Sequence, residues 1–94
     1  MTLQLTHRRA GQDHEFVVDG EVVGRLLWLS ERHDADESPG WVLQMPEWPD
    51  EQVYRAPYAL AHDLDLARRH GESASLGIAQ SILSDRLSGL LPRP

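Results

Sequence analysis

Residues 14–29 read His14-Glu15-Phe16-Val17-Val18-Asp19-Gly20-Glu21-Val22-Val23-Gly24-Arg25-Leu26-Leu27-Trp28-Leu29. The dipeptide Asp19-Gly20 separates two runs rich in β-branched residues. It favours a type I′ turn, because both central residues of that turn adopt positive φ angles. The stretch therefore predicts a β-hairpin. The expected register pairs Val18 with Glu21, Val17 with Val22, Phe16 with Val23, and Glu15 with Gly24.

Both faces of this expected hairpin are apolar. One face carries Phe16, Val18, Val23, Leu27 and Leu29, and the other carries Val17, Val22, Leu26 and Trp28. Antiparallel sheets commonly have one solvated side, so the second face needs a cover: a loop, a second protomer or a partner. Gly24 inside a strand indicates a bulge or a close backbone approach.

Further strands are expected on both sides of the hairpin. Leu3 and Leu5 alternate with polar residues, as in a half-buried strand, and a loop follows at residues 9–13. Residues 41–45 have the composition of a fourth strand, and residues 52–55 fit a short edge strand. The sequence thus predicts a small antiparallel sheet of about four strands between residues 2 and 45.

The second half of the chain predicts two helices. The first spans about 57–70, with Pro57 in its first turn and Gly71 as its stop, and the second spans about 74–88 with Ser73 as its N-cap. The apolar stripe expected on the second helix is Leu76, Ala79, Leu83, Leu87 and Leu90, widened by Ile78 and Ile82. The expected architecture is one α+β domain over residues 1–94, with both helices packed on one face of the sheet.

Composition excludes several classes of protein. The 94 residues contain no cysteine, which excludes a disulfide scaffold and a thiolate zinc site and fits a reducing cytosol, so we expect a cytoplasmic protein. Fifteen acids against nine bases give a net charge of −6, which argues against direct nucleic-acid binding. No apolar run has the roughly 20 residues that cross a bilayer, so we expect no membrane association.

The charge is concentrated in one part of the chain. Residues 31–51 contain seven carboxylates and one arginine, so this stretch alone has a net charge of −6. It is either a solvated insertion or a binding surface for a basic partner. On the second interpretation the partner-binding residues are Glu31, Asp34, Asp36, Glu37, Glu47, Trp48, Asp50 and Glu51.

The three tryptophans are expected to differ in role. Trp28 and Trp41 fall on strands, where a large apolar ring packs into the core. Trp48 lies in the segment Pro46-Glu47-Trp48-Pro49, between acids. Its ring either folds back to cap the edge of the sheet or serves as an aromatic anchor inside an acidic rim, as at an interface hot spot.

Patterns typical of catalysis or metal binding are incomplete. Asp34, Asp36 and Glu37 beside His33 supply part of a hard-cation site, and His62 and Asp65 are spaced i, i+3, but no zinc-type ligand pattern exists. No serine lies in a nucleophile elbow, and no glycine-rich phosphate loop occurs. We therefore expect no enzyme activity, no metal and no cofactor.

A helix-turn-helix is also poorly supported. Residues 66–73 have a turn-like pattern, but Glu72, Gly77 and Gln80 stand where that motif needs apolar contacts.

The segment Asp19-Gly20-Glu21-Val22-Val23-Gly24-Arg25, followed by an apolar strand, a strand that begins with tryptophan and a helix, resembles small uncharacterised bacterial and prophage proteins with a D-G-x-x-V-G-R hairpin. The resemblance covers roughly the first half of the chain and implies a fold without an activity. In size and acidity the chain is also similar to phage proteins such as anti-CRISPRs.

Three functional hypotheses follow. The first is a non-catalytic protein-binding module, most concretely an inhibitor that places carboxylates where a basic, nucleic-acid-binding protein expects phosphates, as in phage anti-defence. The second is a structural homodimer that buries Val17, Val22, Leu26 and Trp28 across a two-fold axis. The third is an immunity protein or antitoxin of a toxin pair.

Overall fold

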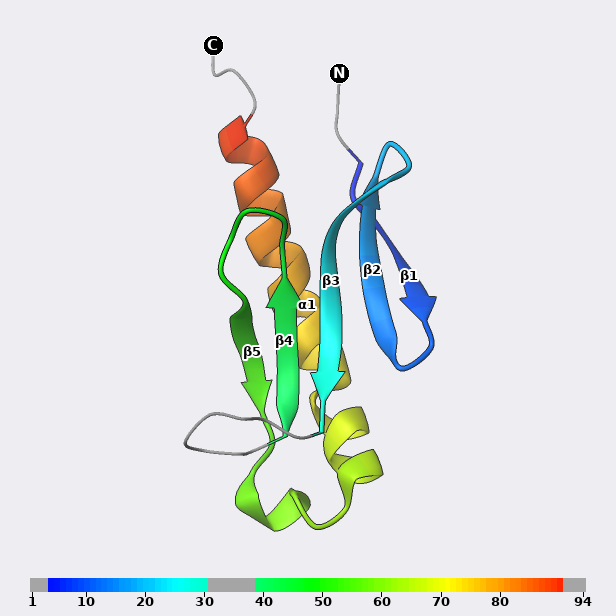
Figure 1. The fold of residues 1–94 in the computed structure, drawn as a ribbon, viewed down its shortest axis with the longest axis vertical. Helices are drawn as coiled ribbons and strands as arrows, with labels where there is room; N and C mark the ends of the chain where they lie inside the picture. Colours follow the sequence, from blue (N-terminus) through cyan, green and yellow to red (C-terminus); the bar gives the residue numbers. More distant parts are fainter. Residues whose placement is uncertain (1–3, 31–38, 91–94) are drawn as a thin grey trace.

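The computed structural model describes residues 4–30 and 39–90, which form a five-stranded antiparallel sheet followed by one long helix (Figure 1). The strands lie side by side in chain order, so the sheet is a meander. Its elements are β1 (Thr6–Ala10), β2 (Asp13–Val18), β3 (Glu21–Leu29), β4 (Gly40–Gln44), β5 (Glu51–Arg55), the 3-10 turn η1 (Tyr58–Leu60) and α1 (Leu64–Leu90). The α+β class and the antiparallel sheet are as predicted.

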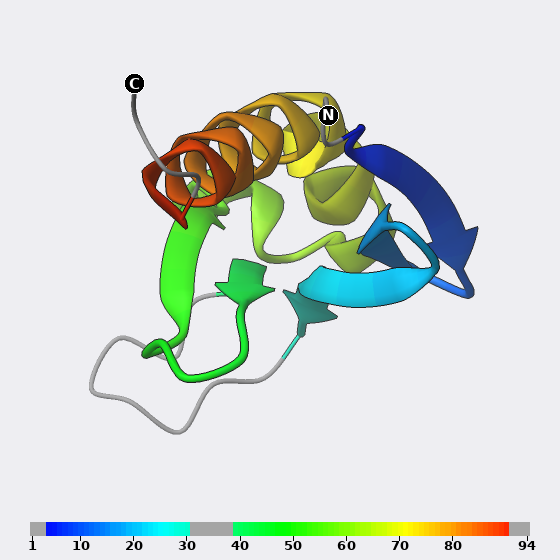
Figure 2. The ribbon, with the colours of Figure 1, turned by 90° about the horizontal axis from the view of Figure 1, so that it is seen from above.

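The helix α1 lies across one face of the curved sheet (Figure 2). Its buried residues recur at every fourth position and are mostly small: Ala67, Gly71, Ser75, Ala79 and Leu83. Small side chains let a helix approach a sheet closely. The sheet contributes larger residues to the shared core, among them Phe16, Leu26, Trp41, Leu43 and Met45.

The prediction of two helices is wrong. Residues 64–90 form a single helix, and Gly71 is buried in its interior. The helix begins earlier than Ser73, because the Asp63 carboxylate accepts a hydrogen bond from the Leu66 N–H at 3.1 Å and caps the first turn. Residues 57–63 form only the 3-10 turn and a bend, with Pro57 at its start. Ile78, expected to widen the apolar stripe, is exposed.

The hairpin forms, but its register changes partway along. Val18 pairs with Glu21 and Val17 with Val22, as predicted, whereas Phe16 pairs with Gly24 because Val23 is an extra residue at a bulge. A one-residue shift moves every later side chain to the opposite face. Gly24 therefore faces the helix, where its backbone approaches the Leu83 side chain. The expectation that Gly24 marks a bulge or a close backbone approach is confirmed.

The bulge corrects the predicted faces. Leu26 and Trp28 lie on the helix side with Trp41 instead of on the far side. Leu27 and Leu29 lie on the far side, where both are half-buried. The far face also carries an ion-paired row, because Glu15 contacts Arg8 at 3.0 Å and Arg25 at 3.4 Å. Two of the four residues assigned to the homodimer surface are thus part of the core.

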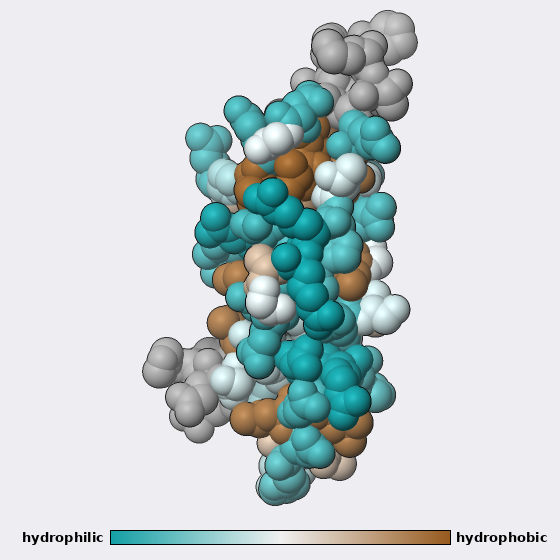
Figure 3. All heavy atoms as spheres, turned by 90° about the vertical axis from the view of Figure 1, so that its right-hand side faces the viewer, coloured by the Kyte–Doolittle hydropathy of each residue, from teal (hydrophilic) through white to brown (hydrophobic). Residues whose placement is uncertain are grey.

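Both edges of the sheet also differ from expectation. The first strand is Thr6–Ala10, so part of the predicted loop at 9–13 is paired strand, and the chain turns at Gly11 with a positive φ of 67°. The short edge strand expected at residues 52–55, within the connector predicted at 46–56, forms as β5 and is one residue longer, which makes five strands rather than about four. All five side chains of β1 are exposed, and the side of the molecule formed by this edge is largely hydrophilic (Figure 3). Polar edges of this kind discourage pairing with another sheet.

Candidate functional site

The turn between β4 and β5 presents part of the predicted binding surface. Pro46 ends the strand pairing because it has no N–H to donate, and Glu47 adopts a left-handed φ of 65°. The Trp48 N–H then donates to the Met45 carbonyl at 3.3 Å and closes the turn. Residues 46–51 are all exposed as a result.

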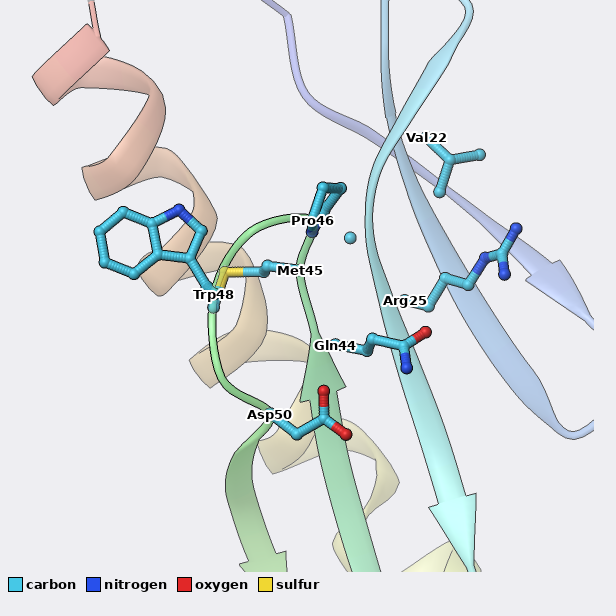
Figure 4. A pocket seen from close by; sticks show the side chains of 8 residues that line it. Val22, Arg25, Gln44, Met45, Pro46, Trp48 and Asp50 are labelled. Carbon is cyan, nitrogen blue, oxygen red and sulfur yellow. The ribbon is translucent and has the colours of Figure 1, made fainter.

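Trp48 projects from this turn toward α1 (Figure 4). The Arg86 guanidinium lies over the indole ring, 3.6 Å from the ring centroid, which is a cation–π contact. Arg86 makes no ion pair with another described residue, and its buried Nε has no hydrogen-bond partner among the described residues. Trp48 nevertheless stays 51 % exposed. The ring is therefore held against Arg86 while the residue remains about half exposed.

The acids that the structure describes fall into two groups. Five are engaged: Glu15, Asp65 and Glu72 pair with arginines, Asp13 accepts from the Trp28 N–H, and Asp63 caps α1. The other six are exposed and have neither an ion pair nor a hydrogen bond to a described residue: Asp19, Glu21, Glu47, Asp50, Glu51 and Asp85.

All six unpaired acids lie toward one end of the domain, although Glu51 pairs with Leu43 and so lies level with Leu26, midway along the sheet. This end, hereafter the acidic end, holds the β2–β3 turn, the β4–β5 turn and the last turns of α1 (Figure 1). A helix C-terminus adds about half a negative charge from its unpaired carbonyls. Of the other described acids, Glu15, Asp65 and Glu72 are ion-paired with arginines, whereas Asp13 and Asp63 accept hydrogen bonds from backbone N–H groups.

Only part of the predicted site can be placed. The structure places Glu47, Trp48 and Asp50 in the β4–β5 turn and Glu51 at the start of β5. The other four predicted residues, Glu31, Asp34, Asp36 and Glu37, lie outside the described residues. Asp19, Glu21 and Asp85 were not predicted, although in a meander the Asp19-Gly20 turn and the turn after residue 45 must lie at the same end of the sheet.

A hollow of about 510 Å³ adjoins the β4–β5 turn (Figure 4). It forms because β3 pairs with β4 only from Arg25 onward, which leaves the first residues of β3 without a neighbour on that side. The hollow is lined by Val22, Gly24, Arg25, Gln44, Met45, Pro46, Trp48 and Asp50. Apolar walls with a few polar groups are typical of small binding sites; here Asp50 and Arg25 supply the charges.

No protein-family model, curated protein or solved structure matches this chain. The geometry of the acidic end is therefore the main guide to function. The helix in the described part of the chain is not apolar enough to cross a membrane. Within residues 4–30 and 39–90, no three metal-ligating side chains converge as a metal site needs.

A second polar cluster joins β1, β2 and α1. His14 is 3 % exposed, and its Nδ1 lies 2.8 Å from Nε2 of His7 in a hydrogen bond between the two rings. The other nitrogen of His14 lies 3.6 Å from the Glu72 carboxylate, which also contacts Arg68 at 3.2 Å and Arg9 at 3.5 Å. Among the described residues, no hydroxyl is hydrogen-bonded to either imidazole, so the cluster offers no activated nucleophile.

This cluster predicts a dependence of stability on pH. Burial lowers the pKa of His14 below its usual value, against the opposing effect of Glu72, and His7 and Arg9 lower it further. Between the lowered pKa and about 6.5 the unfolded chain binds more protons than the folded one, so the free energy of unfolding should rise with pH across that window.

Denaturant titrations from pH 4.5 to 8 measure this slope. We expect His14→Gln to reduce it, whereas His62→Gln, a change at an exposed histidine, should leave it intact. An unchanged slope in His14→Gln would assign the pH dependence to other groups.

Proposed function

We propose that this chain is a non-catalytic protein-binding module whose acidic end binds a basic surface on a partner protein. The observation that supports this proposal is the location of the six unpaired acids among the described residues, which lie toward one end of the domain. Acids that only kept a small domain soluble would have no reason to gather there. An unbalanced patch of one sign attracts a partner of the opposite sign and speeds the encounter.

The partner is most concretely a nucleic-acid-binding protein. Such proteins carry arginines and lysines placed to contact a row of phosphates. The unpaired carboxylates of the β2–β3 and β4–β5 turns offer negative charges to such a surface. Occupation of that surface would exclude nucleic acid, which makes the chain an inhibitor of the kind used in phage anti-defence, acting in the cytoplasm.

A matched pair of double variants tests the proposal. Asp50→Asn with Glu51→Gln removes two charges from the acidic end, and Glu15→Gln with Asp65→Asn removes two charges from ion pairs elsewhere. Each immobilised variant is incubated with the heparin-retained fraction of a bacterial lysate, and bound proteins are eluted with duplex DNA.

We expect the wild type and the control variant to retain proteins that DNA displaces. The Asp50/Glu51 variant should bind them about 2- to 30-fold more weakly, because each exposed ion pair contributes about 0.2–1 kcal/mol. Binding should also weaken steeply between 50 and 500 mM salt. Equal retention by all three proteins, or affinity independent of salt, would refute the proposal.

A further inference from the structure

Trp48 and Arg86 form a prearranged stacking site within the acidic end. The guanidinium covers one side of the indole at 3.6 Å, and no carboxylate of a described residue holds it there. The indole is therefore already a surface on which a guanidinium stacks. Trp48 as a residue is 51 % exposed, so part of its surface is accessible to a second planar group.

The surroundings of the ring select a cation. Glu47, Asp50 and Glu51 belong to the same turn, and Asp85 precedes Arg86 on α1. These four unpaired carboxylates outnumber the single charge of Arg86, so a second cation on the ring is not repelled. Anionic and extended apolar groups would meet uncompensated negative charge at this position.

A guanidinium fits better than an ammonium group. It is planar, weakly hydrated and able to stack on an aromatic face while its N–H groups still bind carboxylates at its edge. A lysine ammonium is a compact, strongly hydrated charge that loses more solvation on the same ring. Because Arg86 fixes the indole, little side-chain entropy is lost when a partner group binds.

We infer that the open side of Trp48 binds an arginine side chain of the partner, opposite Arg86. This inference rests on the proposed function and names the partner's contact group. Two nine-residue peptides test it, one with three arginines and one with lysines at the same positions. Their dissociation constants are measured by calorimetry at 50 mM salt for the wild type, the Asp50→Asn/Glu51→Gln variant, Trp48→Leu and Tyr58→Leu.

Tyr58→Leu is the matched control, since Tyr58 is 85 % exposed and lies at the opposite end of the domain. We expect the wild type and the control to prefer the arginine peptide by about three- to fivefold, in line with exposed cation–π contacts. Trp48→Leu should bind both peptides equally, with a melting curve that shows it folded.

The outcomes separate the two proposals. Equal binding of both peptides by the wild type, or a retained preference in Trp48→Leu, overturns the arginine site. If the Asp50/Glu51 variant nevertheless binds both peptides more weakly than the wild type does, the proposed function stands without the arginine site. If neither peptide binds the wild type at low salt, both proposals fail.

Discussion

Trp41→Ala is expected to lower the free energy of unfolding by about 3–5 kcal/mol, the usual cost of removing a large buried aromatic side chain. Trp41 is fully buried on β4, where its ring packs at 5.4 Å from the Trp28 ring and 5.7 Å from the His14 ring. Its Nε1–H also donates to the Arg68 carbonyl on α1 at 3.1 Å. One side chain thus joins the centre of the sheet to the helix.

The free energy lost in Trp41→Ala is large relative to the total free energy of unfolding. A domain of this size is stable by about 5–15 kcal/mol, so the variant loses a substantial part of that margin. Each kcal/mol corresponds to about 4–8 °C in the midpoint of thermal unfolding for such a domain. Urea titration should show a lower midpoint at an unchanged slope, because the surface exposed on unfolding stays nearly the same.

The other tryptophans provide the comparison. Trp28→Ala should cost less than Trp41→Ala because Trp28 is only half-buried. Trp48→Ala should cost least, since the residue is half exposed and its ring contacts the half-buried side chain of Arg86 rather than the buried core. A loss for Trp48→Ala as large as that for Trp41→Ala would show that the β4–β5 turn, rather than the β4 core, determines stability.

The hairpin was predictable because its signals are local. Asp19-Gly20 specifies the turn, and the pairs nearest to it, Val18 with Glu21 and Val17 with Val22, follow from turn geometry. The faces beyond the bulge were not predictable, because the extra residue at Val23 shifts the register of every later pair. Gly24 was the visible signal, but a glycine indicates a bulge without fixing which residue is extra.

The candidate site was predictable in part for a similar reason. Glu47, Trp48, Asp50 and Glu51 are neighbours in the sequence, so a count of charge along the chain finds them. Asp19, Glu21 and Asp85 come from segments that are nearly balanced in charge. The three-dimensional fold shows that these three acids are left unpaired and lie toward the same end, because it places the β2–β3 turn, the β4–β5 turn and the last turns of α1 there.

The single helix shows where local propensity was misleading. Gly71 lowers helix propensity and is common at helix ends, which suggested a stop. In the fold it lies where α1 passes over β5, and a Cβ at this position would meet the ring of Tyr54. Tyr54 is held there by a hydrogen bond between its hydroxyl and His70 Nδ1 at 3.0 Å. Gly71 is thus required by packing, and the helix tolerates it.

Two glycines of α1 should therefore respond to alanine in opposite directions. Gly71→Ala should destabilise the fold by about 1–3 kcal/mol, the typical cost of overpacking, although alanine is the better helix former. Gly77→Ala should stabilise it by about 0.5–1 kcal/mol, because Gly77 is exposed with open space around its Cα and the substitution lowers only the entropy of the unfolded chain.

Chemical unfolding of both variants, alone and with Tyr54→Ala, distinguishes packing from propensity. If the Tyr54 ring is what opposes a Cβ at position 71, Gly71→Ala should be neutral or stabilising once that ring is gone, while the effect of Gly77→Ala should be the same in either background. Equal, stabilising effects of both substitutions in the wild-type background would mean that α1 does not approach β5 as closely as Gly71 permits.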